Sequence, residues 1–311
     1  MTSVSVRRVV TGHEGGQAVV LSDGAPPNTI SVPSGFGVSE LLWLDGPATG
    51  ADAGGDRDDG GFPLEPPAGG LSARVIRMPG GGDWLRVDDD DPDQPGMHVT
   101  DTLDLMLVLD GRIVLGLPDG ERTLGPGDVV VQQGTPHRWR VSGDDACTYV
   151  VVMLRPDPRH PVPDLSPSAA GGGGIRRVVT GPPIDGEAPD GMRAGGTVLL
   201  DLWQTGGPLA APTQGGDVEG PWALEPAGGG VALRWLEMAP RDFGPDEGWH
   251  TTATIDIDVI LAGRLALELP GGTHTELGAG DVVIQRGTEH RWLPLGDEPV
   301  RMAAVMVAVP T

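Results

Sequence analysis

The sequence predicts an all-β protein built from two copies of one domain. Its 311 residues include 51 Gly and 31 Pro without a collagen-like period, a composition typical of many short strands joined by tight turns. No apolar pattern with the 3.6-residue period of a helix is sustained for more than a turn or two. The same motifs recur in the same order in both halves. The chain is long enough for two domains that each bury a core.

The internal repeat runs through nearly the whole chain and indicates a duplication. The matched segments are RRVVTG (7–12 and 176–181), LEP (64–66 and 224–226), GDVV (127–130 and 280–283) and the pattern GTxHRW (134–139 and 287–292), together with Arg74 and Arg234. Matches in one order across both halves exclude low-complexity coincidence. Each half is therefore expected to form the same β-barrel.

The repeat also predicts the domain boundaries. Residues 1–154 are assigned to the first barrel, residues 155–174 to a Pro- and Gly-rich linker, and residues 175–311 to the second barrel. The strands that begin near Arg7 and Arg176 are expected to belong to the barrels, and they could be exchanged between the halves.

Charge and cysteine content narrow the classes of partner and location. The chain has 44 acidic residues against 21 basic residues, and its formal net charge is −23. This charge repels phosphate backbones and anionic lipid, so nucleic acid and membrane surfaces are not expected as partners. The only cysteine is Cys147, which excludes an intramolecular disulfide. No signal-peptide pattern or membrane-length apolar run is present, and a cytoplasmic protein is expected.

A stripe of polar residues on one strand face is the first sign of a site. Side chains alternate along a strand, so residues of even number after Gly96 share a face. That face carries, in the two halves respectively, His98, Thr100, Thr102 and Asp104, and His250, Thr252, Thr254, Asp256 and Asp258. The opposite face is mostly Leu, Val and Ile, so both faces are expected to be covered. A covered polar stripe costs free energy unless it is hydrogen-bonded or coordinates something.

A second histidine in each half is the predicted partner of this stripe. His137 and His290 each follow a short apolar strand and a tight turn, and Trp139 and Trp292 point the same way two residues later. Two imidazoles and a carboxylate that converge in a barrel form a recognised divalent-metal set with open coordination positions. The predicted metal ligands are His98, Asp104 and His137 in the first barrel and His250, Asp256 and His290 in the second.

These motifs resemble those of the cupin superfamily. That family's first motif ends in Gly and begins with His, and its second motif runs from a Gly-Asp strand to a final His. The matching residues here are His98, Gly111, Gly127 and His137, and then His250, Gly263, Gly280 and His290. The resemblance covers nearly the whole chain and implies two tandem cupin (jelly-roll) barrels. It also implies a divalent metal, for which Fe, Mn or Zn is expected here.

Both halves depart from the family pattern in the same way. The family's second histidine is replaced by Thr100 and Thr252, and its glutamate by Asp104 and Asp256. Thr is a poor metal ligand, and Asp is one methylene shorter than Glu. At most three side chains per barrel remain as ligands. The alternative is a metal-free barrel in which His, Thr and Asp form a buried hydrogen-bond network.

Three functions are compatible with these residues. The first is a metal-dependent enzyme of dioxygenase type that acts on a small phenolic, polyketide-like or carboxylic molecule. The second is a non-redox lyase, isomerase or cyclase that uses the same ligands, and the third is a small-molecule-binding module without catalysis. The substrate pocket is expected to include Thr100, Thr102, Trp139, Thr252, Thr254 and Trp292. A homodimer is a further possibility.

One difference between the halves suggests where catalysis occurs. Met106 in the first half is replaced by Asp258 in the second, on the same inward face. A second carboxylate beside Asp256 should have a raised pKa through burial and like-charge repulsion. Asp258 is therefore the candidate catalytic proton shuttle, and the second barrel the candidate catalytic barrel. A purely structural pairing of Asp258 with an Arg is the alternative.

Overall fold

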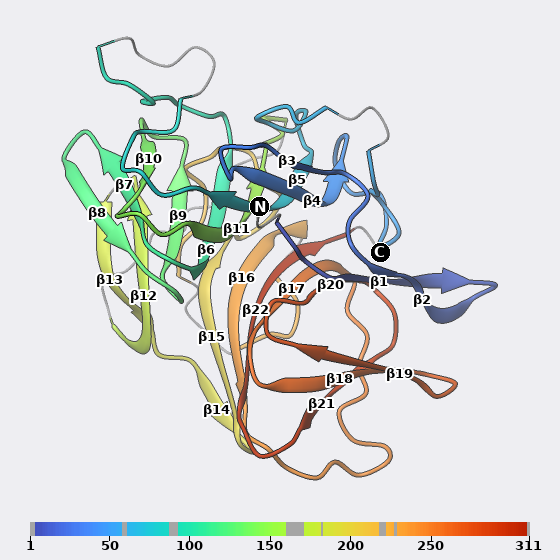
Figure 1. Ribbon diagram of the computed structural model, residues 1–311. Helices are drawn as coiled ribbons and strands as arrows, with labels where there is room; N and C mark the ends of the chain where they lie inside the picture. Colours follow the sequence, from blue (N-terminus) through green and yellow to red (C-terminus); the bar gives the residue numbers. More distant parts are fainter. Residues whose placement is uncertain are drawn as a thin grey trace.

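The computed structural model describes residues 4–57, 61–86, 93–159, 171–181, 183–217, 222–226 and 229–309, and these form the all-β protein that the sequence predicts. The first half contributes strands β1 to β11: Arg8–Glu14, Gln17–Gly24, Thr29–Ser31, Gly37–Leu44, Leu71–Met78, Leu103–Asp110, Ile113–Leu117, Gly120–Leu124, Val129–Gln133, Arg138–Val141 and Cys147–Leu154. The second half contributes strands β12 to β22: Gly172–Thr180, Pro183–Pro189, Met192–Ala194, Thr197–Gln204, Val231–Met238, Thr254–Ala262, Arg264–Leu269, Thr273–Gly278, Val282–Arg286, Arg291–Leu295 and Val300–Ala308. The two series correspond strand for strand (Figure 1).

Each barrel consists of an eight-stranded sheet and a three-stranded sheet. The first barrel has the sheets β13-β12-β9-β6-β11-β5-β4-β3 and β10-β7-β8. The second has the equivalent sheets β14-β15-β16-β22-β17-β20-β1-β2 and β19-β18-β21. Of the predicted linker, residues 160–170 lie outside the described residues. Within the described part of the chain, no helix is long and apolar enough to cross a membrane.

The first hairpin of each half completes the sheet of the other half, which confirms the exchange considered from the sequence. Strand β1 pairs in parallel with β20, with Val9 opposite Val283. Strand β12 pairs in parallel with β9, with Val178 opposite Val130. Figure 1 shows the β1–β2 hairpin beside β20. The repeated RRVVTG segments are therefore the exchanged strands.

Ion pairs explain why this motif recurs together with the Gly-Asp motif. Arg7 Nη1 donates a hydrogen bond to Asp281 Oδ2 at 3.0 Å, and Arg176 Nη1 donates to Asp128 Oδ2 at 3.1 Å. Each bond crosses from one half to the other. The second arginine of the motif is buried: Arg177 Nη1 donates to Asp217 Oδ1 at 2.5 Å and to the Leu202 carbonyl at 2.7 Å. Together these bonds hold the exchanged strands β1 and β12 in place.

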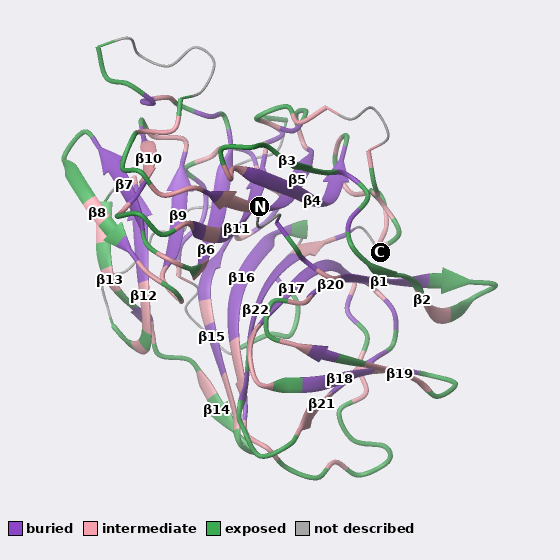
Figure 2. Ribbon diagram, viewed as in Figure 1, coloured by how far each residue is buried: buried purple, intermediate pink, exposed green. Residues whose placement is uncertain are grey.

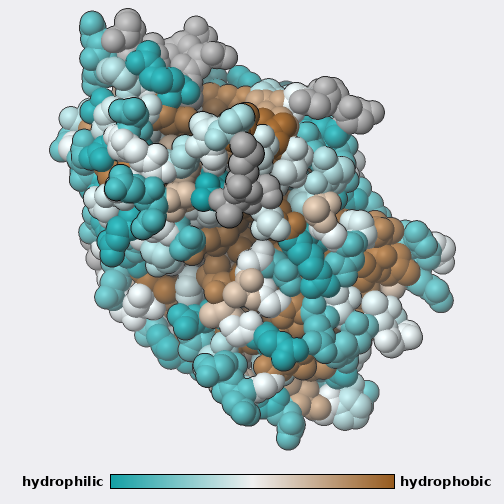
Figure 3. All heavy atoms as spheres, viewed as in Figure 1, coloured by the Kyte–Doolittle hydropathy of each residue, from teal (hydrophilic) through white to brown (hydrophobic). Residues whose placement is uncertain are grey.

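Both faces of each large sheet are covered, as the strand alternation predicts. In β6, Leu103, Leu105 and Leu107 belong to a core shared by the two eight-stranded sheets. The alternate residues Met106 and Val108 face the interior of the first barrel. Figure 2 shows the central strands as buried and the connecting loops as largely exposed. The face drawn in Figure 3 is largely hydrophilic, as expected for a strongly acidic chain.

Candidate functional site

Each barrel brings together two histidines from distant strand ends. His98 and His137 form a two-residue antiparallel bridge, in which each backbone N–H donates to the other's carbonyl at 3.0 Å. Their ring centroids are 4.3 Å apart. His250 and His290 repeat this bridge, with ring centroids 4.2 Å apart. The juxtaposition expected from the sequence is therefore present in both barrels.

A glycine fixes the tight turn that precedes the second histidine of each pair. Gly134 and Gly287 have φ of 61° and 58°, in the left-handed region that side chains other than Gly rarely adopt. A Cβ at Gly134 would lie 2.9 Å from Pro212, and one at Gly287 would lie 2.7 Å from Ala51. In both cases the neighbour comes from the other half. The turn that positions each histidine is thus packed against the opposite repeat.

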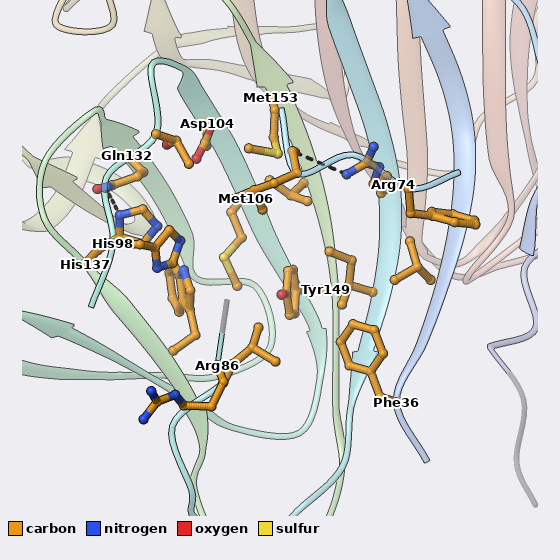
Figure 4. A pocket seen from close by; sticks show the side chains of 18 of the residues that line it. Phe36, Arg74, Arg86, His98, Asp104, Met106, Gln132, His137, Tyr149 and Met153 are labelled. Carbon is orange, nitrogen blue, oxygen red and sulfur yellow. Dashed lines mark hydrogen bonds between the residues drawn. The ribbon is translucent and has the colours of Figure 1, made fainter. Parts of the chain in front are cut away.

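Hydrogen bonds orient the four imidazoles and leave one nitrogen of each ring available. The Nδ1 atoms of His98, His250 and His290 donate to the carbonyls of the residue two positions earlier, at 2.8, 2.8 and 2.9 Å. The Nδ1 of His137 contacts the Thr135 carbonyl at 2.9 Å and the Gln132 amide at 2.5 Å (Figure 4). No described residue forms a hydrogen bond to Nε2 of these rings. This is the arrangement in which histidine binds a metal through Nε2.

Burial keeps one imidazole of each pair neutral. It lowers the pKa of His137 to about 3, and the neighbouring His98 acts in the same direction. Burial likewise lowers the pKa of His290 to about 3, with His250 beside it. A neutral imidazole is the form that donates a lone pair to a metal.

The carboxylates do not join the histidine pairs, which corrects the predicted three-ligand sets. Among the described residues, no three His, Cys, Asp or Glu side chains come close enough to hold a metal ion. The strand does not continue from Asp104 back to His98, because β6 begins only at Leu103 and the chain bends at residues 101–102. The same bend separates Asp256 from His250, because β17 begins at Thr254. Each aspartate is also one methylene shorter than the glutamate of the family motif.

The aspartates are nevertheless buried carboxyl groups with unused hydrogen-bonding capacity. Oδ1 of Asp104 and Oδ1 of Asp256 are buried without a hydrogen-bond partner. Burial raises the pKa of each of these carboxyl groups to about 7. Each can therefore hold or release a proton near neutral pH.

The first barrel encloses a cavity of about 440 Å³, a size suited to a small organic ligand. Its wall is mainly apolar and aromatic. The lining residues that carry polar groups are Arg74, Arg86, His98, Thr100, Asp104, Gln132, His137, Trp139 and Tyr149. Figure 4 shows the two histidines on one side of this cavity and Tyr149 and Phe36 on another.

The second barrel encloses a smaller cavity of about 260 Å³. Its wall includes the predicted residues His250, Thr252, Asp256, Asp258, His290 and Trp292. Burial raises the pKa of Asp258 well above its ordinary value, and the neighbouring Asp256 adds to this.

Two predicted pocket residues do not line the cavities. Thr102 and Thr254 are completely buried beside the carboxylates. Thr254 Oγ1 donates to Thr252 Oγ1 at 2.8 Å, and Thr252 Oγ1 donates to Asp256 Oδ2 at 3.4 Å. Thr254 therefore does not line the cavity itself. Its hydroxyl group donates a hydrogen bond to Thr252, which does line the cavity.

Sequence reasoning missed several cavity residues. Arg74 and Arg234 line the two cavities, and their recurrence at equivalent positions was the available signal. Arg74 pairs with the buried Glu40 at 3.4 Å, and Arg234 pairs with Asp201 at 2.7 Å. Tyr149, the only tyrosine of the chain, had no counterpart in the repeat that could reveal it.

Comparison with known proteins gives short sequence matches. No protein-family model matches the chain. The chain is 41% identical over 64 residues to oryzines biosynthesis cluster protein J of Aspergillus oryzae, a match that covers 21% of this chain and 34% of that protein. It is 32% identical over 81 residues to the cupin-domain-containing oxidoreductase srdB of Neurospora crassa, which covers 26% of this chain and 40% of that one. The matches thus span well under half of these relatives.

Solved structures match over nearly the full length. The TM-score is 0.53 against a protein from Pseudomonas aeruginosa described as glyoxylate induced, with 12% identity and coverage of 98% of this chain and 95% of that one. It is 0.50 against AerE from Microcystis aeruginosa, with 11% identity and coverage of 91% and 97%. At this identity the likeness shows the fold alone.

Proposed function

We propose that this two-barrel chain is a metal-dependent enzyme of the cupin superfamily that acts on a small, largely apolar organic molecule. The observation that carries the proposal is the imidazole pair in the wall of the first cavity. His98 and His137 present Nε2 atoms without a described hydrogen-bond partner. The cavity of about 440 Å³ beside them is lined mainly by apolar side chains. The arrangement suits a substrate held by apolar contacts with its reacting group at the imidazoles.

The histidines fit a divalent metal, and the carboxylates do not complete its ligand set. His98 with His137, and His250 with His290, would supply two imidazole ligands in each barrel; Fe, Mn or Zn suits such donors. When bound, the metal would supply Lewis-acid activation of a coordinated substrate or of O₂. The backbone carbonyls that engage Nδ1 would keep each ring in orientation. Other ligand positions would remain open to substrate.

Oxygen chemistry is proposed on the support of the curated relatives. The Neurospora crassa protein is named an oxidoreductase, and the Aspergillus oryzae protein is named as a member of a biosynthesis cluster. Both matches are short, but they favour oxidation of a small organic molecule. We propose a reaction of dioxygenase type, because two imidazole ligands leave open positions on a metal for both O₂ and substrate.

Metal content tests the first step of this proposal. Protein purified anaerobically is analysed for metal, then stripped with a chelator and titrated with Fe²⁺, Mn²⁺ and Zn²⁺. Loss of one metal per chain is expected in His137→Ala and in His290→Ala. His274→Ala is the matched control, because His274 is exposed and pairs with Glu268 outside both cavities. Equal metal content in all three variants would contradict the ligand assignment.

Oxygen consumption tests the second step. The metal-loaded protein is screened against phenolic, polyketide-like and carboxylic compounds with an oxygen electrode. Consumption that depends on the compound and is lost in His137→Ala or His290→Ala is expected. A compound that binds without O₂ consumption or any chemical change would instead identify a binding module.

The buried carboxyl groups favour a second candidate, a proton-transfer reaction such as an isomerase, lyase or cyclase step. Asp104 lines the first cavity, and its pKa of about 7 suits a general acid or base. Asp104→Asn keeps the shape of the side chain and removes this function. If substrate is converted without O₂ and the variant abolishes conversion while metal content is unchanged, the second candidate replaces the first.

A further inference from the structure

The two cavities differ at one inward-facing position of equivalent strands. In β6 the residue is Met106, which packs in the apolar interior of the first barrel (Figure 4). In β17 the equivalent residue is Asp258. Asp256 and Asp258 therefore face the second cavity together, whereas among the described residues Asp104 is the one carboxylate that lines the first.

No described residue forms an ion pair with either carboxyl group, although the nearby Arg234 acts to lower the pKa of Asp256. Asp256 and Asp258 are 5% and 4% exposed, and both line the cavity. Asp256 Oδ1 is buried without a hydrogen-bond partner, and Asp258 forms no hydrogen bond or ion pair with any described residue. Two buried carboxyl groups in this state are costly unless a ligand satisfies them.

The neighbours of Asp258 leave space for such a ligand. Its cross-strand partners are Val283 on β20 and Ala304 on β22. In the first barrel the partner equivalent to Ala304 is Val151, opposite Met106. The second barrel thus has a shorter side chain on β17 and on β22 at this point, whereas Val283 on β20 matches Val130 of the first barrel; the carboxyl group of Asp258 lines the cavity.

The arginines that line this cavity already form ion pairs with other carboxylates. Arg234 uses Nε for Asp201 at 2.7 Å and Nη2 for the Ala223 carbonyl at 2.8 Å. Arg241 pairs with Glu247 at 2.5 Å.

The remaining titratable groups near the pair supply no counter-charge either. His290 is neutral because burial lowers its pKa, and it contacts the ring of His250. Glu225 adds negative potential at Asp256. Among the described residues, the cations that line the cavity are thus paired with other carboxylates, and Arg234 acts on Asp256 only while it is paired with Asp201.

We propose that the second cavity binds the protonated amino group of a small organic amine between Asp256 and Asp258. Trp292 and the side chains of Met238, Met302 and Met306 line the same cavity and contact the carbon skeleton. Two carboxylates that accept charge-assisted hydrogen bonds are the partners that an ammonium group requires. The first cavity, with Met106 in place of Asp258, selects a ligand without this group.

Binding of an amine has a pH signature. Burial raises the pKa of both carboxyl groups, that of Asp256 to about 7, and Asp256 raises the pKa of Asp258 further, so the pair holds protons near neutral pH. An ammonium ion favours their ionised forms, so binding releases protons. The amine affinity is expected to rise with pH by up to about tenfold per unit for each proton released, as long as the amine stays protonated.

Three isosteric probes test the proposal by calorimetry on the chelator-treated full-length protein. Benzylammonium is expected to bind once per chain, at least about tenfold more tightly than benzyl alcohol, and benzoate is expected to be rejected from this cavity. Proton release is measured by repeating the titration in buffers of different ionisation enthalpy. Because no metal is present, the outcome does not depend on the proposed metal-dependent function.

Variants locate the binding. Asp258→Met installs the residue of the first barrel and should weaken benzylammonium binding by about 10- to 100-fold. Asp258→Asn preserves the shape of the side chain and should also weaken benzylammonium binding. Met106→Leu lies in the other cavity and should leave benzylammonium binding unchanged. Equal affinity for benzylammonium and benzyl alcohol, or undiminished amine binding in both Asp258 variants, would overturn the proposal.

Discussion

Removal of two methyl groups from Val9 should destabilise the barrel made by the opposite end of the chain. Val9 lies on β1 and is fully buried. Among the described residues it is the one residue of the first half that is a buried member of the interior core of the second barrel. Val9→Ala removes about 1.6 kcal/mol of burial at about 0.8 kcal/mol per methylene. The cavity left behind brings the expected loss to about 2 to 3 kcal/mol. This corresponds to an increase of about 30- to 150-fold in the opening equilibrium.

Amide hydrogen exchange measures this destabilisation for each strand separately. Faster exchange is expected in β18, β20 and β21 of the second barrel, more than 250 residues from the substitution. Val178→Ala is the matched control, because Val178 occupies the equivalent position on β12 and packs in the core of the first barrel. It should loosen β7, β9 and β10 instead. If Val9→Ala loosens the first barrel selectively, the assigned role of the exchange is wrong.

Three further predictions concern single groups. The pKa of Asp104 is raised to about 7, above its unfolded value near 4, so the free energy of unfolding should fall as pH rises from about 4 to 7. Asp104→Asn should flatten that part of a plot of urea midpoint against pH. The pKa of His137 is lowered to about 3, so the free energy of unfolding should fall as pH drops below about 6.5. His137→Gln should reduce this loss of stability in acid, and an unchanged dependence of the urea midpoint on pH would refute the prediction. Burial raises the pKa of Cys147 to about 12, so a thiol reagent at pH 8 should label it only after unfolding.

The fold could be predicted because the evidence for it is repeated along the chain. Two copies of each motif distinguish a pattern from chance, and the strand alternation in β6 and β17 holds wherever the backbone is extended. The exchange was only one of two arrangements compatible with the RRVVTG repeat. Sequence distance does not reveal whether β1 pairs with β9 or with β20, since both strands carry the same Gly-Asp motif.

The candidate site was predicted in part. The histidine pairs depend on a local turn and a two-residue bridge, both of which are marked by the GTxHRW pattern. The position of Asp104 relative to His98 depends on the bend between them, which strand parity cannot reveal. Cavity size depends on distant side chains such as Phe36 and Leu85, which no local pattern connects to the histidines.

The exchanged hairpins impose an order on biosynthesis. Arg176 meets Asp128 across only 48 residues, so the first barrel can complete its sheet soon after its own strands are made. Thr11 meets Gln285 across 274 residues, and the second barrel must recruit the hairpin that was synthesised first. At about 5 to 20 residues per second, β1 and β2 wait on the order of 14 to 55 s for their partner strand. During that interval, the hairpin with its apolar edge is the segment of the nascent chain that most needs protection from association with other chains.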